Sequence, residues 1–566
     1  MIKIDGIEVK HEGEKNLLEL IKKVGVDIPT FCYQPHLSSF GSCRMCIVEV
    51  AGRGVVPACS TAVTDGMVVT TTSKQLLTTR KMLVELILAA HDQQCTACPK
   101  SGDCKLQSVA KDLGVAKVRF EQGNRANTFD DSSVAIVRDT SKCILCGSCV
   151  RQCSEVQAVG ALDFAYRGSN AKVLTEFNRD MGGTGCVNCG QCVKVCPVGA
   201  LTVKTQIEAV IDALDDKKKI CVVQVAPAVR VAIGERFGLP VGTATMPKII
   251  SALRRMGFDK VYDTSFAADL TVVEEGREFL NRFTKGGKLP LFTSCCPAWV
   301  KYAEQYYPEM LNNLSTCKSP QQKFGALVKD KLTKDMKIKR EDLVVVSVMP
   351  CTAKKFEAAR DEFKVGGNPD VDYVITTDEL AQMIKMGGLD FNKLQDANFD
   401  APYGEATGAG IIFGASGGVS EAVLRWAASQ LDKSGNYEFK QFRGNDSTTI
   451  SEIKIGDVAL RLAVVSGLDN AKKLMAKIKG GAEKVHLVEV MACCGGCVNG
   501  GGQPVGCSGC TTKKRAEGLY GLDKKSVAKE SGENCAVTEV YKELDEHKVH
   551  KLLHTKYKSR AKTNKK

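Results

Sequence analysis

The chain has 566 residues, of which 44% are hydrophobic, and this length predicts several domains with ordinary apolar cores. No stretch approaches the roughly 18 consecutive apolar residues of a membrane span, and the first residues lack a signal-peptide pattern, so we expect a cytoplasmic protein that does not enter a membrane. The net charge of +13 suits nucleic acid, an anionic surface or an acidic protein partner. The sequence lacks the aromatic-rich basic groove or recognition motif that nucleic acid would require.

Residues 1–80 are expected to form a [2Fe-2S] domain. Two short alternating segments, residues 2–4 and 7–10, precede a helical run over residues 16–24, an order that resembles the β-grasp of plant-type ferredoxins. Four cysteines follow at the spacing C-x10-C-x2-C-x12-C: Cys32, Cys43, Cys46 and Cys59. Four thiolates are what a [2Fe-2S] cluster needs. Zinc is the alternative, but zinc ligands usually come as two close pairs, and only Cys43 and Cys46 form one.

A second cluster motif is expected within residues 81–125, at the end of a helical segment over residues 73–91. Its four members are spaced H-x3-C-x2-C-x5-C: His91, Cys95, Cys98 and Cys104. A histidine at a helix end is usually structural, but this one stands one helical turn before Cys95. We therefore predict a [4Fe-4S] cluster with one imidazole ligand, whose neutral charge should raise the reduction potential.

Residues 126–208 carry an internal repeat typical of bacterial two-cluster ferredoxins. Two runs share the spacing C-x2-C-x2-C-x3-C: Cys143, Cys146, Cys149 and Cys153, then Cys186, Cys189, Cys192 and Cys196. In this pattern the fourth cysteine of each run ligates the cluster of the other run, which predicts two [4Fe-4S] clusters. Ser154 stands where the pattern often has proline, a change in a turn and not in a ligand.

Residues 209–566 are expected to form a large α/β domain with mainly parallel sheets. Strand-like runs at residues 220–226 and 343–349 alternate with amphipathic helical runs at 246–256 and 421–431. The glycine-rich run 410–418 lacks the spacing of a phosphate-binding loop. Ligands in such sheets bind beyond the carboxyl ends of strands, where the cysteine-bearing segments 293–299 and 349–354 fall. The chain as a whole is therefore expected to be an α+β multidomain protein.

Three segments, 293–299, 349–354 and 489–497, place cysteine beside proline or glycine, where the backbone must turn tightly around a metal-sulfur cluster. In order and content they resemble the three active-site signatures of [FeFe]-hydrogenases, and the resemblance extends over nearly the whole chain. It also covers the His91 segment, which larger hydrogenases share with a subunit of respiratory complex I. The resemblance implies an H-cluster: a [4Fe-4S] cube bridged to a diiron unit with carbonyl, cyanide and dithiolate ligands. The implied cube ligands are Cys296, Cys351, Cys493 and Cys497, of which Cys497 also bridges to the diiron unit.

The same resemblance implies the walls of the diiron pocket. Lys354 corresponds to the lysine that contacts a cyanide, and its compact ammonium group suits a buried anion. The other lining residues implied are Pro227, Gln321, Met349, Phe413 and Met491. Two positions depart from the family pattern. Ala228 replaces a serine that reaches the other cyanide in many relatives, and Cys494 stands where cysteine is unusual, beside the ligand Cys493.

Proton transfer is assigned to Cys295, since its neighbour Cys296 already completes the cube and a thiol of ordinary pKa lies near neutral pH. By resemblance, the route from Cys295 to water runs through Glu275, Ser315, Glu278 and Arg282. Glu275 and Glu278 are three residues apart in a helix predicted over residues 270–283, so they share a face.

The function implied is reversible hydrogen production, 2H⁺ + 2e⁻ ⇌ H₂, in a monomer with one [2Fe-2S] cluster, three accessory [4Fe-4S] clusters and the H-cluster. Protons and H₂ are the substrates, dedicated maturation enzymes supply the diiron unit, and ferredoxin or flavodoxin exchanges electrons. A non-catalytic iron-sulfur assembly factor of the same fold, or a hydrogen sensor, is the alternative. The cysteines left over are Cys221, Cys317, Cys494, Cys507, Cys510 and Cys535. For the pair Cys507 and Cys510, and for His547, His550 and His554 at helical spacing, we favour a structural role.

Overall fold

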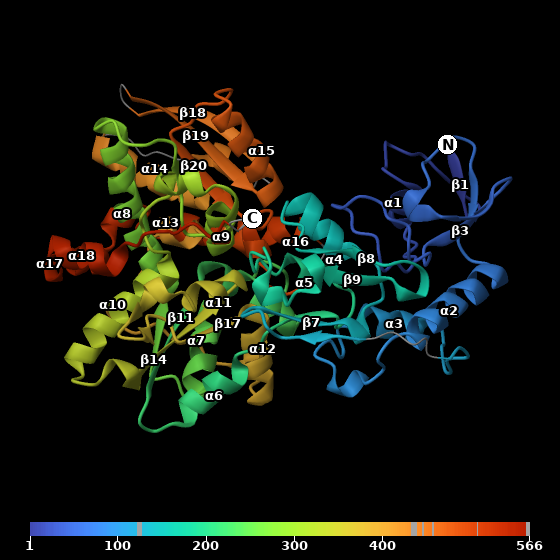
Figure 1. Cartoon of the computed structure of the whole chain (residues 1–566), viewed down its shortest axis with the longest axis horizontal. Helices are drawn as coiled ribbons and strands as arrows, with labels where there is room; N and C mark the ends of the chain where they lie inside the picture. Colours follow the sequence, from blue (N-terminus) through green and yellow to red (C-terminus); the bar gives the residue numbers. More distant parts are fainter. Residues whose placement is uncertain (122–126, 432–438, 444–446, 456–457, 507, 562–566) are drawn as a thin grey trace. The chain divides into compact units, whose positions relative to one another are not determined.

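The computed structural model describes residues 1–121, 127–431, 439–443, 447–455, 458–506 and 508–561. They group into two compact units, the first of residues 1–186 and 191–204, the second of residues 187–190 and 205–566 (Figure 1). The boundary expected at residue 125 lies outside the described residues, and the one at residue 80 stays a prediction. None of the helices in the described ranges is both long and apolar enough to cross a lipid bilayer.

The first unit opens with a five-stranded sheet of order β2-β1-β5-β3-β4. Its strands are β1 (Ile2–Ile4), β2 (Ile7–Val9), β3 (Ile47–Val50), β4 (Gly54–Pro57) and β5 (Val68–Thr70). β1 runs parallel to β5, and the other pairings are antiparallel. Helix α1 (Leu17–Lys23) begins after Asn16, whose side chain accepts a hydrogen bond from the N–H of Glu19 at 3.1 Å. Its leucines pack on the sheet in a core that also contains Cys46 and Cys59.

The rest of the first unit is built from short elements around the remaining cysteine runs. Helix α2 (Lys74–Ala89) is capped by Ser73, close to the predicted bounds, and α3 (Lys105–Asp112) follows Cys104. An antiparallel sheet of order β10-β7-β6 contains β6 (Phe129–Asp130), β7 (Ile136–Asp139) and β10 (Leu201–Val203). The other elements are the hairpin β8 (Leu162–Ala165) and β9 (Lys172–Thr175), α4 (Ser148–Arg151) and α5 (Gln191–Val195).

Two four-stranded sheets organise the second unit. The first has the order β12-β11-β14-β17, with β11 (Ile220–Val225), β12 (Lys260–Asp263), β14 (Leu343–Met349) and β17 (Tyr373–Thr376) all parallel. The second has the order β13-β20-β19-β18, with β13 (Leu291–Phe292), β18 (Thr448–Ile455), β19 (Val458–Ser466) and β20 (Leu487–Met491). Only its β18–β19 pairing is antiparallel. Every residue of β14 is buried, as expected for a parallel strand with helices on both faces.

Helices surround both sheets of the second unit; α14 (Gly418–Leu431) and α15 (Leu468–Lys479) lie beside β20 and β19 (Figure 1). The longest is α8 (Thr264–Thr284), which extends beyond the predicted range of 270–283 and begins at the capping side chain of Asp263. The other helices that matter for the site are α9 (Pro297–Tyr306), α10 (Pro320–Asp335), α11 (Ala353–Ala358) and α13 (Gly408–Ile412). Further elements are α6 (Ile207–Asp215), α7 (Met246–Arg255), α12 (Thr377–Met386), α16 (Ser508–Lys525), α17 (Cys535–Glu543) and α18 (Glu546–Leu553).

Candidate active site

Three cysteine-bearing loops of the second unit leave the carboxyl ends of parallel strands. β13 ends at Phe292, β14 at Met349 and β20 at Met491, and each is followed directly by one of the three signature segments. β13 and β20 belong to one sheet and β14 to the other. Both sheets therefore contribute to a single site, where α/β folds bind their ligands.

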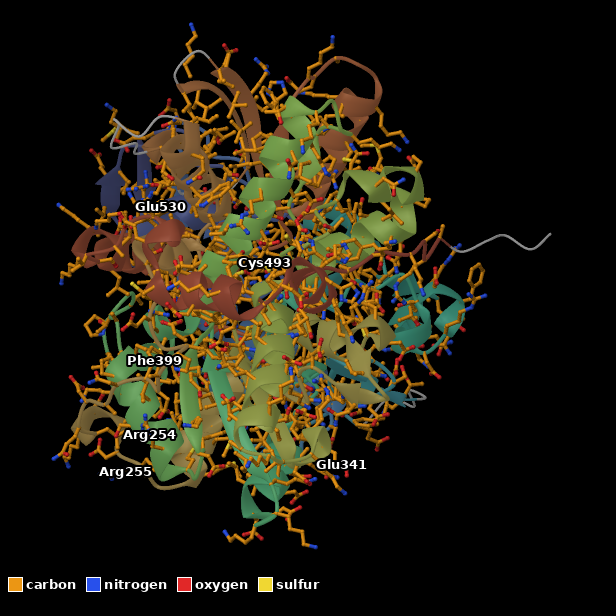
Figure 2. All side chains as sticks on the ribbon, turned by 90° about the vertical axis from the view of Figure 1, so that its left-hand side faces the viewer. Arg254, Arg255, Glu341, Phe399, Cys493 and Glu530 are labelled. Atoms are coloured by element: carbon orange, nitrogen blue, oxygen red, sulfur yellow. The ribbon has the colours of Figure 1, made fainter. Side chains whose placement is uncertain are left out.

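The loops meet at one cavity, here called the cysteine cavity. Its lining includes Cys295, Cys296, Cys351 and Cys497, and it also contains the pocket residues that the sequence singled out: Pro227, Gln321, Met349, Lys354, Phe413 and Met491. Cys493 is only 8% exposed and lies near the centre of the view in Figure 2, whereas Arg254 and Arg255 lie toward its lower edge. Ala228 presents a methyl group to the cavity. Cys494 is half-buried and is absent from the described lining.

The four cysteines assigned to the cube influence one another electrostatically. Burial, followed by the proximity of Cys493 and Cys296, raises the pKa of the Cys351 thiol, and burial together with Cys351 does the same for Cys497. The sulfur of Cys296 accepts a hydrogen bond from the N–H of Ala492 at 3.5 Å. Buried thiols lose their protons readily only to a bound metal. Sulfur donors of this kind, walled by methionine, phenylalanine and proline, fit an iron-sulfur cube with an attached metal unit.

Lys354 also lines the cysteine cavity. It donates hydrogen bonds to the carbonyl of Cys295 at 3.2 Å and to Glu357 at 2.8 Å. Burial alone would lower the pKa of Lys354, but the Glu357 carboxylate outweighs this effect and raises it. Gln321 also donates to Glu357, at 3.1 Å, while its Oε1 atom is buried without a protein partner among the described residues. The fixed ammonium group fits an anionic ligand, whereas the amide oxygen that lacks a partner fits a hydrogen-bond donor.

Glu357 and Ser319 were not found from the sequence. The hydroxyl of Ser319 donates to Glu357 at 2.8 Å, so this carboxylate gathers three side chains and holds Lys354 in place. The i, i+3 spacing of Lys354 and Glu357 on α11 was a local signal. The contribution of Ser319, which is 38 residues distant in the chain, had none.

The proton-route residues lie along α8, in the loop after β13 and in the segment that precedes α10. Glu275 is fully buried, neither carboxylate oxygen has a hydrogen-bond partner among the described residues, and burial raises its pKa to about 7. The Ser315 hydroxyl donates to Glu278 at 3.1 Å, and Glu278 forms an ion pair with Arg282. Arg282 also donates to the carbonyl of Leu314 at 3.1 Å, and its side chain is 15% exposed. Ser315, Glu278 and Arg282 are therefore connected, Glu275 is buried on the same helix as Glu278, and the order of proton transfer stays a prediction.

Cys295 differs from the expectation in one respect. Its thiol does not have an ordinary pKa near neutral pH; burial, followed by the nearby Glu275 carboxylate, raises the pKa well above that. At neutral pH the thiol therefore holds its proton, and Glu275 is the neighbouring group whose pKa lies near neutrality. The pair therefore sets a protonated thiol beside a carboxyl group that can gain or lose a proton near neutral pH.

In the first unit, the [2Fe-2S] candidates form one group. The Cys32 thiol is hydrogen-bonded to those of Cys43 and Cys59, and Cys46 is hydrogen-bonded to Cys59. Cys32, Cys46 and Cys59 are each 1% exposed. This arrangement gathers four sulfur atoms in the space that two iron atoms need.

Each ferredoxin-like run places its last cysteine near cysteines of the other run. Cys143, Cys146, Cys149 and Cys196 line a single cavity. Cys153 lies within electrostatic reach of Cys186, and its sulfur accepts a hydrogen bond from the N–H of Ala161 at 3.3 Å. Cys189 falls in residues 187–190, which group with the second unit, so its place in the second ligand set stays a prediction.

The surroundings of two residues in the His91 motif are described by the structure. The Nδ1 atom of His91 is buried and has no protein hydrogen-bond partner among the described residues. Cys98 packs against Gly199, where an added Cβ atom would lie 2.7 Å from the cysteine sulfur. Both observations fit a metal ligand set, although the shared coordination of Cys95, Cys98, Cys104 and His91 stays a prediction. Cys507 lies outside the described residues, Cys510 and Cys535 are exposed, and Cys221 is buried with its thiol donating to Ala213.

Comparison with family models divides the chain in the same order. The "Iron only hydrogenase large subunit, C-terminal domain" matches residues 219–501, and the "Iron hydrogenase small subunit" matches 510–560. Before them, a "2Fe-2S iron-sulfur cluster binding domain" matches residues 1–74 and a "4Fe-4S dicluster domain" matches 142–200. The "NADH-ubiquinone oxidoreductase-G iron-sulfur binding region" matches residues 80–119, which contain the His91 motif.

Whole-chain relatives carry the same arrangement. The chain is 45% identical to the NADP-reducing hydrogenase subunit HndD of Solidesulfovibrio fructosivorans, covering 98% of each chain. It is 38% identical to iron hydrogenase 1 of Clostridium pasteurianum, covering 98% of this chain and 99% of that one. A solved structure of apo [FeFe]-hydrogenase HydA1 from Chlamydomonas reinhardtii aligns with a TM-score of 0.58 at 39% identity, covering 63% of this chain and all of the other.

Assembly factors are more distant. The cytosolic iron-sulfur assembly component 3 of Mus musculus is 31% identical and covers 68% of this chain and 84% of that one. The hydrogenase matches are both closer and longer, and they include the N-terminal cluster domains.

Proposed function

This chain belongs to the iron-only ([FeFe]) hydrogenase family and is an iron hydrogenase, and we propose that the cysteine cavity is where it interconverts protons, electrons and H₂. One observation carries the proposal. Loops from two separate sheets bring the cysteines and the polar and apolar residues of all three signature segments to one buried cavity. Such convergence of distant segments is the geometric test of an active-site motif.

Each group of residues has a role in this proposal. Cys296, Cys351, Cys493 and Cys497 would hold a [4Fe-4S] cube with its attached diiron unit. When bound, this group would supply the metal centre at which protons and electrons combine. Lys354, held by Glu357, would offer its ammonium group to an anionic part of the cofactor. Pro227, Gln321, Met349, Phe413 and Met491 form the wall that excludes water from it.

Protons reach the cavity through Cys295, Glu275, Ser315, Glu278 and Arg282. The Cys295 thiol would hold a proton in the cysteine cavity, and Glu275 would replenish it because its raised pKa lets it take and give a proton near neutral pH. The Ser315 hydroxyl donates to Glu278, and the ion pair with Arg282 fixes the Glu278 carboxylate near the surface.

Electrons travel through the first unit. We assign one [2Fe-2S] and three accessory [4Fe-4S] clusters to its cysteines and His91, and ferredoxin or flavodoxin as the carrier, since both are acidic and the chain carries a net charge of +13. The diiron unit comes from dedicated maturation enzymes. We propose a monomer in the cytoplasm, because so many grouped cluster thiols suit a reducing compartment.

The test is infrared spectroscopy combined with an assay of H₂ production. After maturation with the dedicated enzymes, we expect bands of metal-bound carbonyl and cyanide, and H₂ formation from a reduced carrier. Protein produced without those enzymes should show neither. A fully matured protein that lacks the bands would be an assembly factor, and one that has the bands but very slow turnover would be a sensor.

A further inference from the structure

The C-terminal segment of the second unit fixes an imidazole beside the proton route. His554 follows α18 directly, and its backbone pairs with Cys317 in an antiparallel bridge. The N–H of Lys318 donates to the carbonyl of Leu553 at 2.8 Å, and the N–H of Thr555 donates to the carbonyl of Thr316 at 2.7 Å. The carboxylate of Glu278, the sulfur of Cys317 and a ring nitrogen of His554 all lie within 4.8 Å of one another.

A continuous chain of hydrogen bonds joins this imidazole to Glu278. The Oγ1 hydroxyl of Thr316 donates to Oε2 of Glu278 at 3.1 Å. The same Oγ1 atom of Thr316 lies 2.8 Å from Nδ1 of His554. On the other side of the ring, Nε2 lies 2.8 Å from Oε2 of Glu274. Thr316 is therefore the only link between Glu278 and the ring in this chain of described contacts.

The number of protons on each side chain fixes the direction of each hydrogen bond between Glu278 and Glu274. A threonine hydroxyl has one proton, so while Thr316 donates to Glu278 it must accept from Nδ1–H of His554. A carboxylate has no proton to give, so Nε2 must also donate, to Glu274. With an ionised Glu278 the ring is thus an imidazolium. With a protonated Glu278 the two bonds of the Thr316 hydroxyl reverse, so Nδ1 becomes the acceptor while Nε2 still donates to Glu274.

Charged and titratable groups surround the ring. Burial alone would raise the pKa of Glu274, but its hydrogen bond to His554 and the charge of Lys323 outweigh burial and hold the pKa at about 2. Glu274 therefore stays ionised. The His550 ring stacks on His554 with 5.2 Å between centroids. The titratable and charged groups around the ring are Glu274, Arg277, Glu278 and Arg282 on α8, Lys323 on α10, Tyr541 on α17, His550 on α18, and Cys317.

We propose that His554 is a proton-storing branch of the proton route, which exchanges a proton with Glu278 through the Thr316 hydroxyl. The inference rests on the proposed route through Glu278. In the exchange, the Glu278 carboxyl gives its proton to the Thr316 oxygen while the Thr316 proton moves to Nδ1 of His554. The products are a carboxylate and an imidazolium, and no electron moves. Imidazole is the side chain whose charge changes nearest neutral pH, which suits such a store.

The branch gives Glu278 a second source of protons. Each proton that Glu278 passes inward can be replaced from His554 without waiting for water to reach the carboxylate. The His554 side chain is 12% exposed, so it can be recharged from solvent. His554 acts through Glu278 and is not itself next to the metal site.

Two variants separate this role from a purely structural one. His554→Gln keeps hydrogen-bonding atoms on both sides but cannot take up a proton, and Thr316→Val removes only the link. The matched control is His550→Gln, because His550 is exposed and is the neighbouring ring. All are compared as matured protein by H₂ turnover between about pH 5.5 and 8.5, with infrared bands to verify the loaded cofactor.

We expect the ratio of wild-type to His554→Gln turnover to change at least about threefold across this pH range, and the ratio for His550→Gln to stay constant. Thr316→Val should reproduce the effect, Thr316→Ser should restore the wild-type profile, and the double variant should be no slower than the slower single variant. A pH-independent ratio, or single effects that multiply, would overturn the inference. The variant Glu278→Gln separates a failure of the proton route from a failure of the His554 branch. Normal turnover of Glu278→Gln would refute the route through Glu278. Slow turnover of Glu278→Gln, together with a wild-type pH profile for His554→Gln, would refute only the branch.

Discussion

Replacing Glu275 by glutamine should stabilise the second unit and slow the enzyme at the same time. Glu275 is fully buried without a hydrogen-bond partner among the described residues, and burial raises its pKa from 4.5 to about 7. A carboxyl with a raised pKa destabilises the fold above pH 4.5, where the unfolded chain ionises, and the penalty is complete above pH 7. At about 1.4 kcal/mol for each pKa unit, the full penalty is about 3 kcal/mol.

Glutamine has the same shape but never ionises, so the gain in the free energy of unfolding should grow from about 1 kcal/mol at about pH 5.5 to about 3 kcal/mol at about pH 8. Turnover should fall by a factor of about 100 to 10,000, the usual contribution of a general acid or base. The assay compares melting temperatures and H₂ turnover of matured wild type and variant across this pH range; the gain should reach a few degrees at the alkaline end.

Glu274→Gln is the matched control, one residue away on the same helix. Its pKa is held at about 2, because the hydrogen bond to His554 and the charge of Lys323 outweigh burial. A lowered pKa contributes stability above pH 4.5 that is lost only as the pH falls toward 2, so this variant should be less stable by a constant amount between about pH 5.5 and 8. A stability gain in Glu275→Gln that is flat with pH, or turnover within tenfold of wild type, would refute the reasoning.

Three further outcomes are expected. Cys295→Ser should keep the carbonyl and cyanide infrared bands while turnover falls by several orders of magnitude, whereas Cys296→Ser should prevent assembly of the site; bands lost from the first variant would contradict this division. Fully matured protein should contain roughly 20 iron atoms per chain by elemental analysis, and protein made without the maturation enzymes should lack the diiron unit and be inactive. Carrier-dependent turnover should fall as salt rises, since the net charge of +13 attracts an acidic partner; a flat salt dependence would show that the charge serves solubility only.

Much of the catalytic fold was predictable from local pattern. The strand at Leu343–Met349 matches its predicted range, and α14 and α7 differ from theirs only at their ends. Periodicity and strand-end position are local properties, and a buried parallel strand reads as an uninterrupted apolar run. The division into two sheets, and the order of strands within each, was not predictable, because strand pairing is decided by contacts far apart in the sequence.

The site shows the same contrast. The spacing of the cysteines predicted them as cluster ligands. The contact of Thr316 with His554 could not be predicted in this way, because it spans 238 residues and neither residue belongs to a metal-binding motif. His554 was therefore assigned a structural role, and its bonds to Thr316 and Glu274 became visible only in the structure. The raised pKa of Cys295 was missed for a similar reason, since burial depends on the whole packed unit.

The division of the cavity between two sheets has a consequence for biogenesis. The loop after β14 supplies only Cys351, while the loops after β13 and β20 supply Cys296, Cys493 and Cys497. No contiguous stretch of the chain that forms one sheet alone contains a complete ligand set, and β13 and β20 themselves are separated by nearly two hundred residues that include β14. On the proposed ligand assignment, a polypeptide that stops before β20 would lack two of the four cube ligands. Loading of the proposed cofactor would then select chains in which both sheets of the second unit have folded.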